Sequence, residues 1–455
     1  MGKATNQFSE HILGLLDSDV TQVDGNRFYV ALSKSDAWLG NAIAPVDDSL
    51  YSQKIFRNKM QSVKRVSAAT YVVPRVNWVT STAYESYDDT KSKQTNFYVM
   101  NSSFEVFVCV EAPSTIAGTT VSTVEPTKAL SLAAHVNNPA KSFKTSDGYI
   151  WRYLYTLSSY ARANFLSSDW MPVKTITSQN PSIEEEVEQL ALQDSAVAGE
   201  ILGVKIIDGG SGYSSNPTVS ISPSTSTAAF TASYDAGAGD VFKINLDTDG
   251  SGLIAHGGGI SELYASASIT GNANVQAIQG PIGGLNNNPV VSLKANSLLT
   301  RSVINGDEDG ILRIGNDYKQ YGLILNPTQY GSSTPFSANE GNALKGLTVN
   351  DTSNLVLDDV ISQSSGTISG VSVDKTATQI YYFQTDSTGY EPFVNGTISY
   401  QVAPDRTVSG TINPDVDTSS GKILYIGHSD ELSGVTRGSA QSDEIRIIIN
   451  LEDCE

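Results

Sequence analysis

The sequence predicts a mainly-β protein made of several β-sandwich-like or barrel-like modules with a few short helices. Only 17% of the residues are charged, whereas Gly, Ser, Thr and Asn are abundant, and these residues favour turns and short strands over long helices. Short runs of β-branched and aromatic residues recur along the chain. At 455 residues the chain is also too long for one typical domain.

The first part of the chain combines expected strands with two amphipathic stretches. Apolar residues at helical spacing predict a helix over 7–16, and 49–64 is also helix-compatible. Strands are expected at 27–32, 66–75 and 148–157. Two β-prone runs within 96–110 flank Asn101-Ser102-Ser103, which predicts a hairpin.

A further short helix is expected after residue 180. Ser182 and Glu185 have the spacing of a capping box, and acidic residues fill the first turn, as the helix dipole prefers. The apolar stripe of this helix is expected to consist of Ile183, Val187, Leu190 and Ala191.

The rest of the chain reads as strands, and one of its segments is repeated. From about 200 to 280 the pattern is β only, and the strand that runs into Gly210-Ser211-Gly212 has an echo before Gly250-Ser251-Gly252, at an offset of 40 residues. This predicts a small duplicated β-module. Further strands are expected within 311–326, 356–402, 421–426 and 444–451, and the last of these should pair inside a sheet.

Charge and cysteine content exclude several classes of protein. The net charge of −19 repels phosphate backbones and anionic lipids, so we expect neither a nucleic-acid-binding nor a membrane protein. Cys109 and Cys454 form no disulfide framework and no zinc motif. The N-terminus lacks a signal-peptide pattern, which favours assembly in a cytoplasm.

No motif with catalytic spacing is present, so we expect a protein that is not an enzyme and needs no cofactor or metal. His11, His135, His256 and His428 lie far apart, and neither a nucleophile elbow nor a phosphate-binding loop occurs. Two acidic loops, one with Asp247 and Asp249 and one with Asp307 and Asp309, resemble the start of a calcium loop. Turn chemistry is the favoured interpretation of both, and calcium binding stays open.

Five segments, taken in order, resemble the baseplate wedge subunit of T-even-type contractile-tailed phages, the product of gene eight. The most specific is 147–157, DGYIWRYLYTL, which is similar to the family's DGYvWeYLf signature. The others are 28–38 (FYVALSKSDAW), 72–78 (VVPRVNW), 317–327 (DYKQYGLILNP) and the closing block in 421–426 and 441–451.

The resemblance implies a structural virion protein in the tail baseplate that forms a homodimer, links neighbouring wedge subunits and is assembled in the host cytoplasm. It divides the chain into an N-terminal family region (1–180), a helix with an inserted Gly/Ser-rich β-module (181–287), a return to the family region (288–349), a second inserted β-module (350–418) and closing strands (419–455). The residues that carry the resemblance are expected to serve packing or interfaces, and Arg75 could also fork onto a carboxylate. These residues are Trp38, Pro74, Arg75, Trp78, Asp147, Gly148, Trp151, Tyr153, Gln320, Asn326, Pro327 and Tyr425.

Two other functions remain alternatives at this point. The Gly/Ser/Asn-rich β-content is also typical of a carbohydrate- or receptor-binding tail-fibre protein. A tailspike glycan hydrolase would need only two carboxylates that meet in space, which the sequence cannot reveal.

Overall fold

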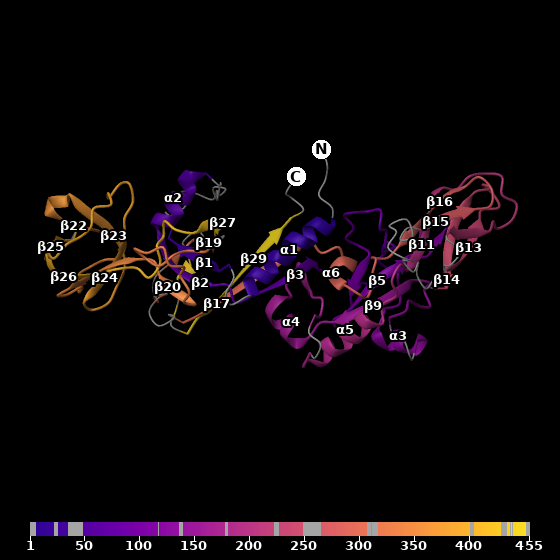
Figure 1. Cartoon of the computed structure of the whole chain (residues 1–455), viewed down its shortest axis with the longest axis horizontal. Helices are drawn as coiled ribbons and strands as arrows, with labels where there is room; N and C mark the ends of the chain where they lie inside the picture. The colour runs from indigo at the N-terminus through magenta and orange to yellow at the C-terminus, as the bar shows by residue number, and fades with distance from the viewer. Residues whose placement is uncertain are drawn as a thin grey trace. The chain divides into compact units, whose positions relative to one another are not determined.

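The structure is a computed structural model, and it confirms the predicted mainly-β, multi-module class (Figure 1). The chain forms two compact units, which are described separately. Unit 1 comprises Met1–Leu15, Thr70–Leu299 and Ile448–Glu455, and unit 2 comprises Leu16–Ala69 and Thr300–Ile447. The residues described are 6–21, 26–34, 49–116, 118–135, 140–177, 181–222, 227–248, 265–306, 311, 317–400, 405–428, 435–436, 438 and 440–451.

Four elements cross the boundary between the units, and three of them belong to one sheet. Helix α1 spans Asn6–Thr21, as the sequence predicted for 7–16. The sheet has the order β10-β3-β17-β29. Its strands are β10 (Trp170–Val173), β3 (Ala68–Pro74), β17 (Ser297–Asn305) and β29 (Ser442–Asn450). The C-terminal run therefore pairs within a sheet, as expected.

The centre of unit 1 is a four-stranded antiparallel sheet of order β4-β5-β9-β8. The predicted hairpin at 96–110 is confirmed, because Met100 pairs with Val106 across the turn. Side chains from both faces are buried in two apolar clusters. The sheet strands are β4 (Tyr98–Met100), β5 (Glu105–Glu111), β8 (Phe143–Lys144) and β9 (Ile150–Thr156). The other elements of this region are β6 (Ser114–Thr115), β7 (Gly118–Thr119), α3 (Lys128–Ala134), α4 (Ser159–Phe165), α5 (Glu184–Asp194) and α6 (Pro289–Ser292).

A small β-module follows α5 and consists of three antiparallel pairs, β11–β16, β12–β15 and β13–β14. The two strands of the predicted echo are present as β11 (Ile201–Asp208) and β14 (Val241–Thr248), whereas the glycine turn of the second copy lies outside the described residues. Val204, Val241 and Ile244 share a cluster with Ala232, so the module has its own small core. The remaining strands are β12 (Val219–Ser222), β13 (Ala229–Tyr234), β15 (Ser266–Ile269) and β16 (Asn274–Gln279).

Unit 2 contains a five-stranded sheet of order β20-β2-β1-β19-β27. Its middle strand, β1, is buried along its whole length and pairs with β2 on one side and β19 on the other. The strands are β1 (Phe28–Ser33), β2 (Met60–Arg65), β19 (Gln320–Leu325), β20 (Glu340–Asn342) and β27 (Lys422–His428). Helix α2 (Leu50–Asn58) and the pair of β18 (Asp317–Tyr318) with β28 (Val435–Thr436) also belong to this unit.

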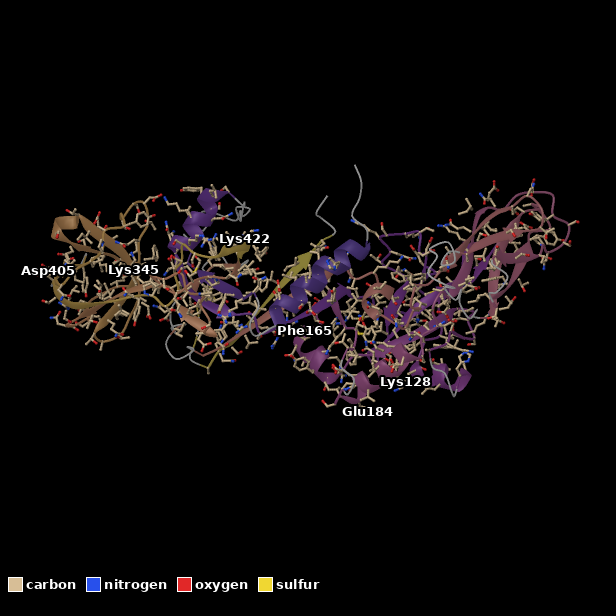
Figure 2. All side chains as sticks on the ribbon, in the orientation of Figure 1. Lys128, Phe165, Glu184, Lys345, Asp405 and Lys422 are labelled. Atoms are coloured by element: carbon tan, nitrogen blue, oxygen red, sulfur yellow. The ribbon has the colours of Figure 1, made fainter. Side chains whose placement is uncertain are left out.

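The second module of unit 2 is a closed antiparallel barrel of order β21-β24-β23-β22-β25-β26. Leu347, Ile380 and Ile398 are among the side chains that fill its interior. Figure 2 shows Lys345 and Asp405 in this barrel. The barrel strands are β21 (Lys345–Val349), β22 (Val360–Gln363), β23 (Ile368–Lys375), β24 (Gln379–Phe383), β25 (Gly396–Ser399) and β26 (Arg406–Ile412), with a 3₁₀ turn η3 (Ser364–Gly366).

Two helix predictions are wrong in part. The stretch 49–64 is helical only up to Asn58, since residues from Met60 onward pair with β1 and β20 and this pairing overrides the local helical pattern. The capping box before α5 is absent: Ile183 occupies the N-cap and makes no side-chain hydrogen bond.

The buried face of α5 also differs from the predicted apolar stripe. Val187 is half-exposed, whereas Gln189, Leu192 and Gln193 are buried. The Gln193 amide accepts from Ile176 N–H at 3.0 Å and donates to Ile176 O at 3.0 Å, so polar pairing decides which face is buried.

The predicted domain boundaries remain a prediction.

Candidate functional site

A cleft of about 370 Å³ lies in unit 1 between residues 84–91, the end of β5 and strands β11 and β14. Its apolar lining residues, called the floor below, are both aliphatic and aromatic, and its charged lining residues are called the rim. The rim combines three carboxylates with three lysines, so its formal charge is balanced. The floor includes Tyr84, Tyr87, Val110, Leu202, Val204, Phe242, Ile244 and Ile278, and the rim includes Glu85, Asp88, Lys91, Glu111, Lys205 and Lys243.

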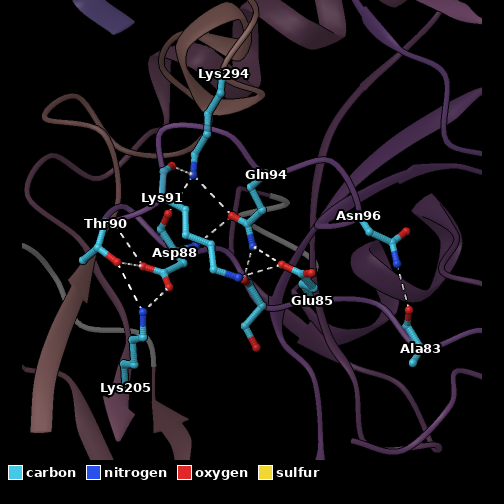
Figure 3. A network of polar contacts seen from close by, with 10 residues as sticks. Ala83, Glu85, Asp88, Thr90, Lys91, Gln94, Asn96, Lys205 and Lys294 are labelled. Carbon is cyan, nitrogen blue, oxygen red and sulfur yellow. Dashed lines mark hydrogen bonds and ion pairs between the residues drawn. The ribbon is translucent and has the colours of Figure 1, made fainter. Parts of the chain in front are cut away.

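One side of the rim is held by contacts within residues 85–94 (Figure 3). Lys91 Nζ donates to Glu85 Oε2 at 2.9 Å, and Gln94 Nε2 donates to the same oxygen at 3.3 Å. The hydrogen bond from Lys91 lowers the pKa of Glu85 below its usual value. Gln94 also donates to Ser86 O at 2.7 Å. The carboxylate of Glu85 is therefore ionised and already engaged.

Asp88 connects this loop to strand β11 (Figure 3). Lys205 Nζ donates to Asp88 Oδ2 at 2.7 Å, and the Thr90 hydroxyl donates to Asp88 Oδ1 at 2.5 Å. Burial alone would raise the pKa of Asp88, but the bonds from Lys205 and Thr90 outweigh it and lower the pKa. The contact ties the loop to the inserted module across the mouth of the cleft.

Lys294 holds the same loop from behind the rim (Figure 3). Its ammonium lies 4.9 Å from the ring centroid of Tyr87 and 5.1 Å from that of Phe97. Burial lowers the pKa of Lys294 to about 8, while nearby carboxylates oppose this shift. The ammonium donates to Asp88 O at 2.7 Å, to Lys91 O at 2.7 Å and to Gln94 Oε1 at 3.2 Å.

Glu111 and Lys243 form the other side of the rim. Glu111 Oε2 accepts the backbone N–H of Leu246 at 2.6 Å. Burial raises the pKa of Glu111, and the nearby Lys243 ammonium opposes that shift. Within the described part of the chain, the ammonium of Lys243 makes no hydrogen bond or ion pair, so this rim lysine can donate to a bound molecule.

The described residues that carry the family resemblance do not line this cleft. Several of them surround strand β9 instead. Trp151 and Tyr153 are fully buried, and Trp78 packs against the same cluster. Trp78 Nε1 donates to Ser122 Oγ at 3.1 Å, and this hydroxyl donates to Asp147 Oδ2 at 3.1 Å.

Asp147 and Gly148 form the turn that leads into β9. Gly148 has a φ of 93°, and its N–H donates to Thr145 O at 2.9 Å. Asp147 accepts the backbone N–H groups of Thr123 at 2.8 Å and Val124 at 2.9 Å. This carboxylate therefore organises two chain segments around the start of β9.

Arg75 makes no contact with a carboxylate in the described part of the chain, so the fork that the sequence allowed is not seen there. Its Nη1 donates to Ser167 O at 2.7 Å, and its Nε donates to Asn77 Oδ1 at 3.0 Å. The neighbouring Pro74 accepts the Tyr98 hydroxyl at 2.6 Å through its carbonyl.

The remaining family-like residues lie in unit 2. Gln320 opens β19 and pairs with Ser33. Asn326 has a φ of 50° and its Oδ1 accepts Arg27 N–H at 2.7 Å, a conformation that asparagine tolerates better than most residues. Pro327 O accepts Phe336 N–H at 2.9 Å. Tyr425, on edge strand β27, is 41% exposed and its ring lies 6.2 Å from that of Tyr321.

Several residues singled out from the sequence lie outside the described residues. They are Trp38, Asp249, His256, Asp307, Asp309 and Cys454. Asp247 is described, and its Oδ2 accepts the Thr231 hydroxyl at 2.5 Å, a contact within the hairpin. Neither calcium loop is therefore tested.

Sequence reasoning missed the buried ion pair of Arg152 and Glu200. Both side chains are almost completely buried, and Arg152 Nη2 donates to Glu200 Oε1. Arg152 also donates to Ala140 O at 2.5 Å and to Ser142 Oγ at 3.0 Å. Because Glu200 immediately precedes β11, the pair anchors the inserted module to β9.

The described residues contain no group of three or more His, Cys, Asp or Glu side chains that could hold a metal ion. No helix among them is both long and apolar enough to cross a membrane. No family model matches the chain, and the search of curated proteins returns no match.

Proposed function

We propose that this protein is a structural subunit of a contractile phage tail, a baseplate wedge protein that links neighbouring subunits. The observation that carries the proposal is the position of segments that resemble this family. Strands β1, β19 and β27 come from three of them, far apart in the sequence, and they are neighbours in one sheet. Phe28 pairs with Leu325, and Leu323 pairs with Tyr425.

The segments without family resemblance support the same interpretation. Residues 200–285 contain the three-pair β-module, which has its own apolar cluster. Residues 350–415 supply five of the six barrel strands, and a separate cluster fills the barrel. A framework with two appended β-modules is the arrangement expected of a family member that has acquired insertions.

The framework also presents surface suited to partners. Strand β27 lies at the edge of its sheet, and Leu424 and Tyr425 on it are exposed. Tyrosine at an exposed strand edge can pack on a partner with its ring and hydrogen-bond with its hydroxyl.

The test is assembly with the other wedge proteins of the same virion. The purified chain is mixed with each neighbouring wedge subunit, and complexes are measured by analytical ultracentrifugation. We expect a stoichiometric complex with at least one of them. If no neighbour forms a complex with the folded chain, the wedge assignment is wrong.

A further inference from the structure

The cleft of unit 1 lies between two strands whose facing edges are not paired. Among the described strands, β11 pairs only with β16 and β14 pairs only with β13. A backbone bond from Val241 N–H to Gly209 O, at 2.9 Å, joins the two hairpins at one end. The cleft is lined by Leu202 to Ile206 of β11 and by Phe242 to Ile244 of β14, so both strands line it with consecutive residues.

The backbone of β14 directs hydrogen-bonding groups into this space. The N–H of Leu246 points away from β13, because it donates to Glu111 Oε2 at 2.6 Å. In an antiparallel strand the N–H and C=O of every second residue point to the same edge. The N–H and C=O of Ile244 therefore face the cleft, where they can pair with another strand.

The composition of the cleft selects the kind of molecule that fits. The apolar floor accommodates an apolar side chain, and the charge-balanced rim attracts neither a strong anion nor a strong cation. On that rim, Lys243 can donate to a carbonyl and Glu111 can accept an N–H. An uncharged peptide backbone with an apolar side chain meets all three requirements. Its carbonyl can accept from Lys243, its N–H can donate to Glu111, and its side chain can lie on the floor.

We propose that this cleft binds an extended segment of a partner protein, which pairs with β14 at Ile244 and places an aliphatic side chain on the floor. This is strand addition to an exposed edge, in which main-chain bonds give affinity and a side-chain pocket gives specificity. The inference rests on the proposed function for the identity of the partner, a neighbouring wedge subunit. The loop on the other side needs no rearrangement, because Lys205 and Lys294 already hold it.

A saccharide is the main competing occupant, because sugar rings stack on aromatic faces and Tyr84, Tyr87 and Phe242 are among the lining residues. The edge of β14 that pairs with no described strand favours a peptide, since a peptide backbone can add to it. Saccharide binding is one of the outcomes that the experiment separates.

The experiment compares two adjacent substitutions in β11. Ile206 lines the cleft, whereas Ile207 does not and is 52% exposed. Ile206→Arg places a charged side chain in the cleft, and Ile207→Arg adds the same charge outside it. Overlapping synthetic peptides that cover the neighbouring wedge subunits are titrated into the full-length wild-type chain and both variants, with fluorescence anisotropy as the readout.

We expect an apolar peptide to bind the wild type and Ile207→Arg equally and to bind Ile206→Arg about tenfold or more weakly. Methylation of alternate backbone nitrogens in that peptide should abolish binding, because strand pairing needs them. Equal binding to Ile206→Arg, or unchanged binding of the methylated peptide, would overturn the proposal, as would binding of glycan fragments without binding of any peptide.

Two further measurements keep the test interpretable. If Ile206→Arg lowers the melting temperature, Lys243→Glu replaces it, because this half-buried rim side chain makes no hydrogen bond or ion pair among the described residues. If intact neighbours bind the wild type and the cleft variants equally well, the wedge assignment stands and the cleft proposal fails. If no neighbour binds the wild type, the wedge assignment itself fails.

Discussion

Arg152 forms a buried ion pair that its sequence context does not predict. In the motif DGYIWRYLYTL it stands among large apolar side chains. It is fully buried, and its partner Glu200 comes from the segment that has no family resemblance. No local pattern could pair two residues that far apart, so this anchor was not predictable.

Replacing Arg152 with Met should strongly destabilise unit 1. The change leaves the Glu200 carboxylate buried without its partner, which costs about 3–5 kcal/mol of unfolding free energy. Urea denaturation followed by tryptophan fluorescence measures the loss. The double variant Arg152→Met with Glu200→Leu should recover much of it, because two apolar groups replace the pair. A single variant as stable as the wild type would contradict the role assigned to this pair.

The lowered pKa of Asp147 predicts that the stability of the fold depends on pH in the acid range. Burial alone would raise its pKa, but hydrogen bonds from Thr145, Val124, Thr123 and Tyr149 outweigh burial and hold the pKa below the ordinary 3.8. A carboxyl whose pKa is lower in the folded state stabilises the fold above pH 3.8, and that contribution is lost as the pH falls through the lowered pKa.

Asp147→Asn should therefore destabilise the protein at neutral pH and reduce the loss of stability below about pH 4. Thermal melting of wild type and variant across the acid range measures both effects. Asp194→Asn, which removes a carboxylate at an exposed position, is not expected to change the acid dependence in this way. Identical acid dependence in wild type and Asp147→Asn would show that other carboxyls dominate.

At the scale of elements, strands were more predictable than helices. The hairpin at 96–110 and the strands β11 and β14 follow from local patterns of β-prone residues. Helix α5 exposes Val187 and buries Gln193 because the glutamine amide pairs with Ile176. Hydrophobic periodicity cannot anticipate a buried face that is chosen by hydrogen bonds.

Strand β19 tolerates no side chain at Gly322. A Cβ there would lie 2.8 Å from Phe56 Cζ and 2.8 Å from Tyr425 O. Gly322→Ala should therefore destabilise unit 2 by about 1–3 kcal/mol, the usual cost of overpacking. Gly410→Ala is the matched control in a barrel strand, because its nearest contact is Thr348 Oγ1 at 3.8 Å. Denaturant unfolding of both variants makes the comparison, and equal stabilities would contradict the steric argument.

The barrel should fold without the rest of unit 2. Its first and last strands are neighbours, and Gly346 pairs with Ile412, so the chain enters and leaves at one place. We expect a fragment covering 343–416 to unfold cooperatively, as measured by circular dichroism during heating. A fragment with no thermal transition would show that the barrel depends on contacts with the framework, such as the ion pair of Lys54 with Asp386.

At the scale of the whole molecule, the sequence predicted the fold class and the presence of β-modules but not the cleft. The cleft walls come from residues 84–91, β5, β11 and β14, and no short motif links these segments. The twelve family-like residues are recognisable because each belongs to a contiguous signature, and those that are described serve turns, cores and strand edges. Contiguous patterns reveal such positions, whereas a cleft formed by distant segments requires the structure.

The resemblance implies a homodimer, and the negative charge of the chain implies that the stability of this dimer depends on salt concentration. Two copies that each carry a net charge of −19 repel each other, and salt screens this repulsion over a Debye length of about 8 Å at physiological ionic strength. We therefore expect a dimer mass in light scattering at physiological salt and a shift toward monomer when the salt is diluted. Tyr425→Ala on the exposed edge of β27 should weaken the dimer if that edge forms the interface. A trimer that resists detergent would instead favour the tail-fibre alternative, and a monomer at all salt concentrations would contradict the dimer.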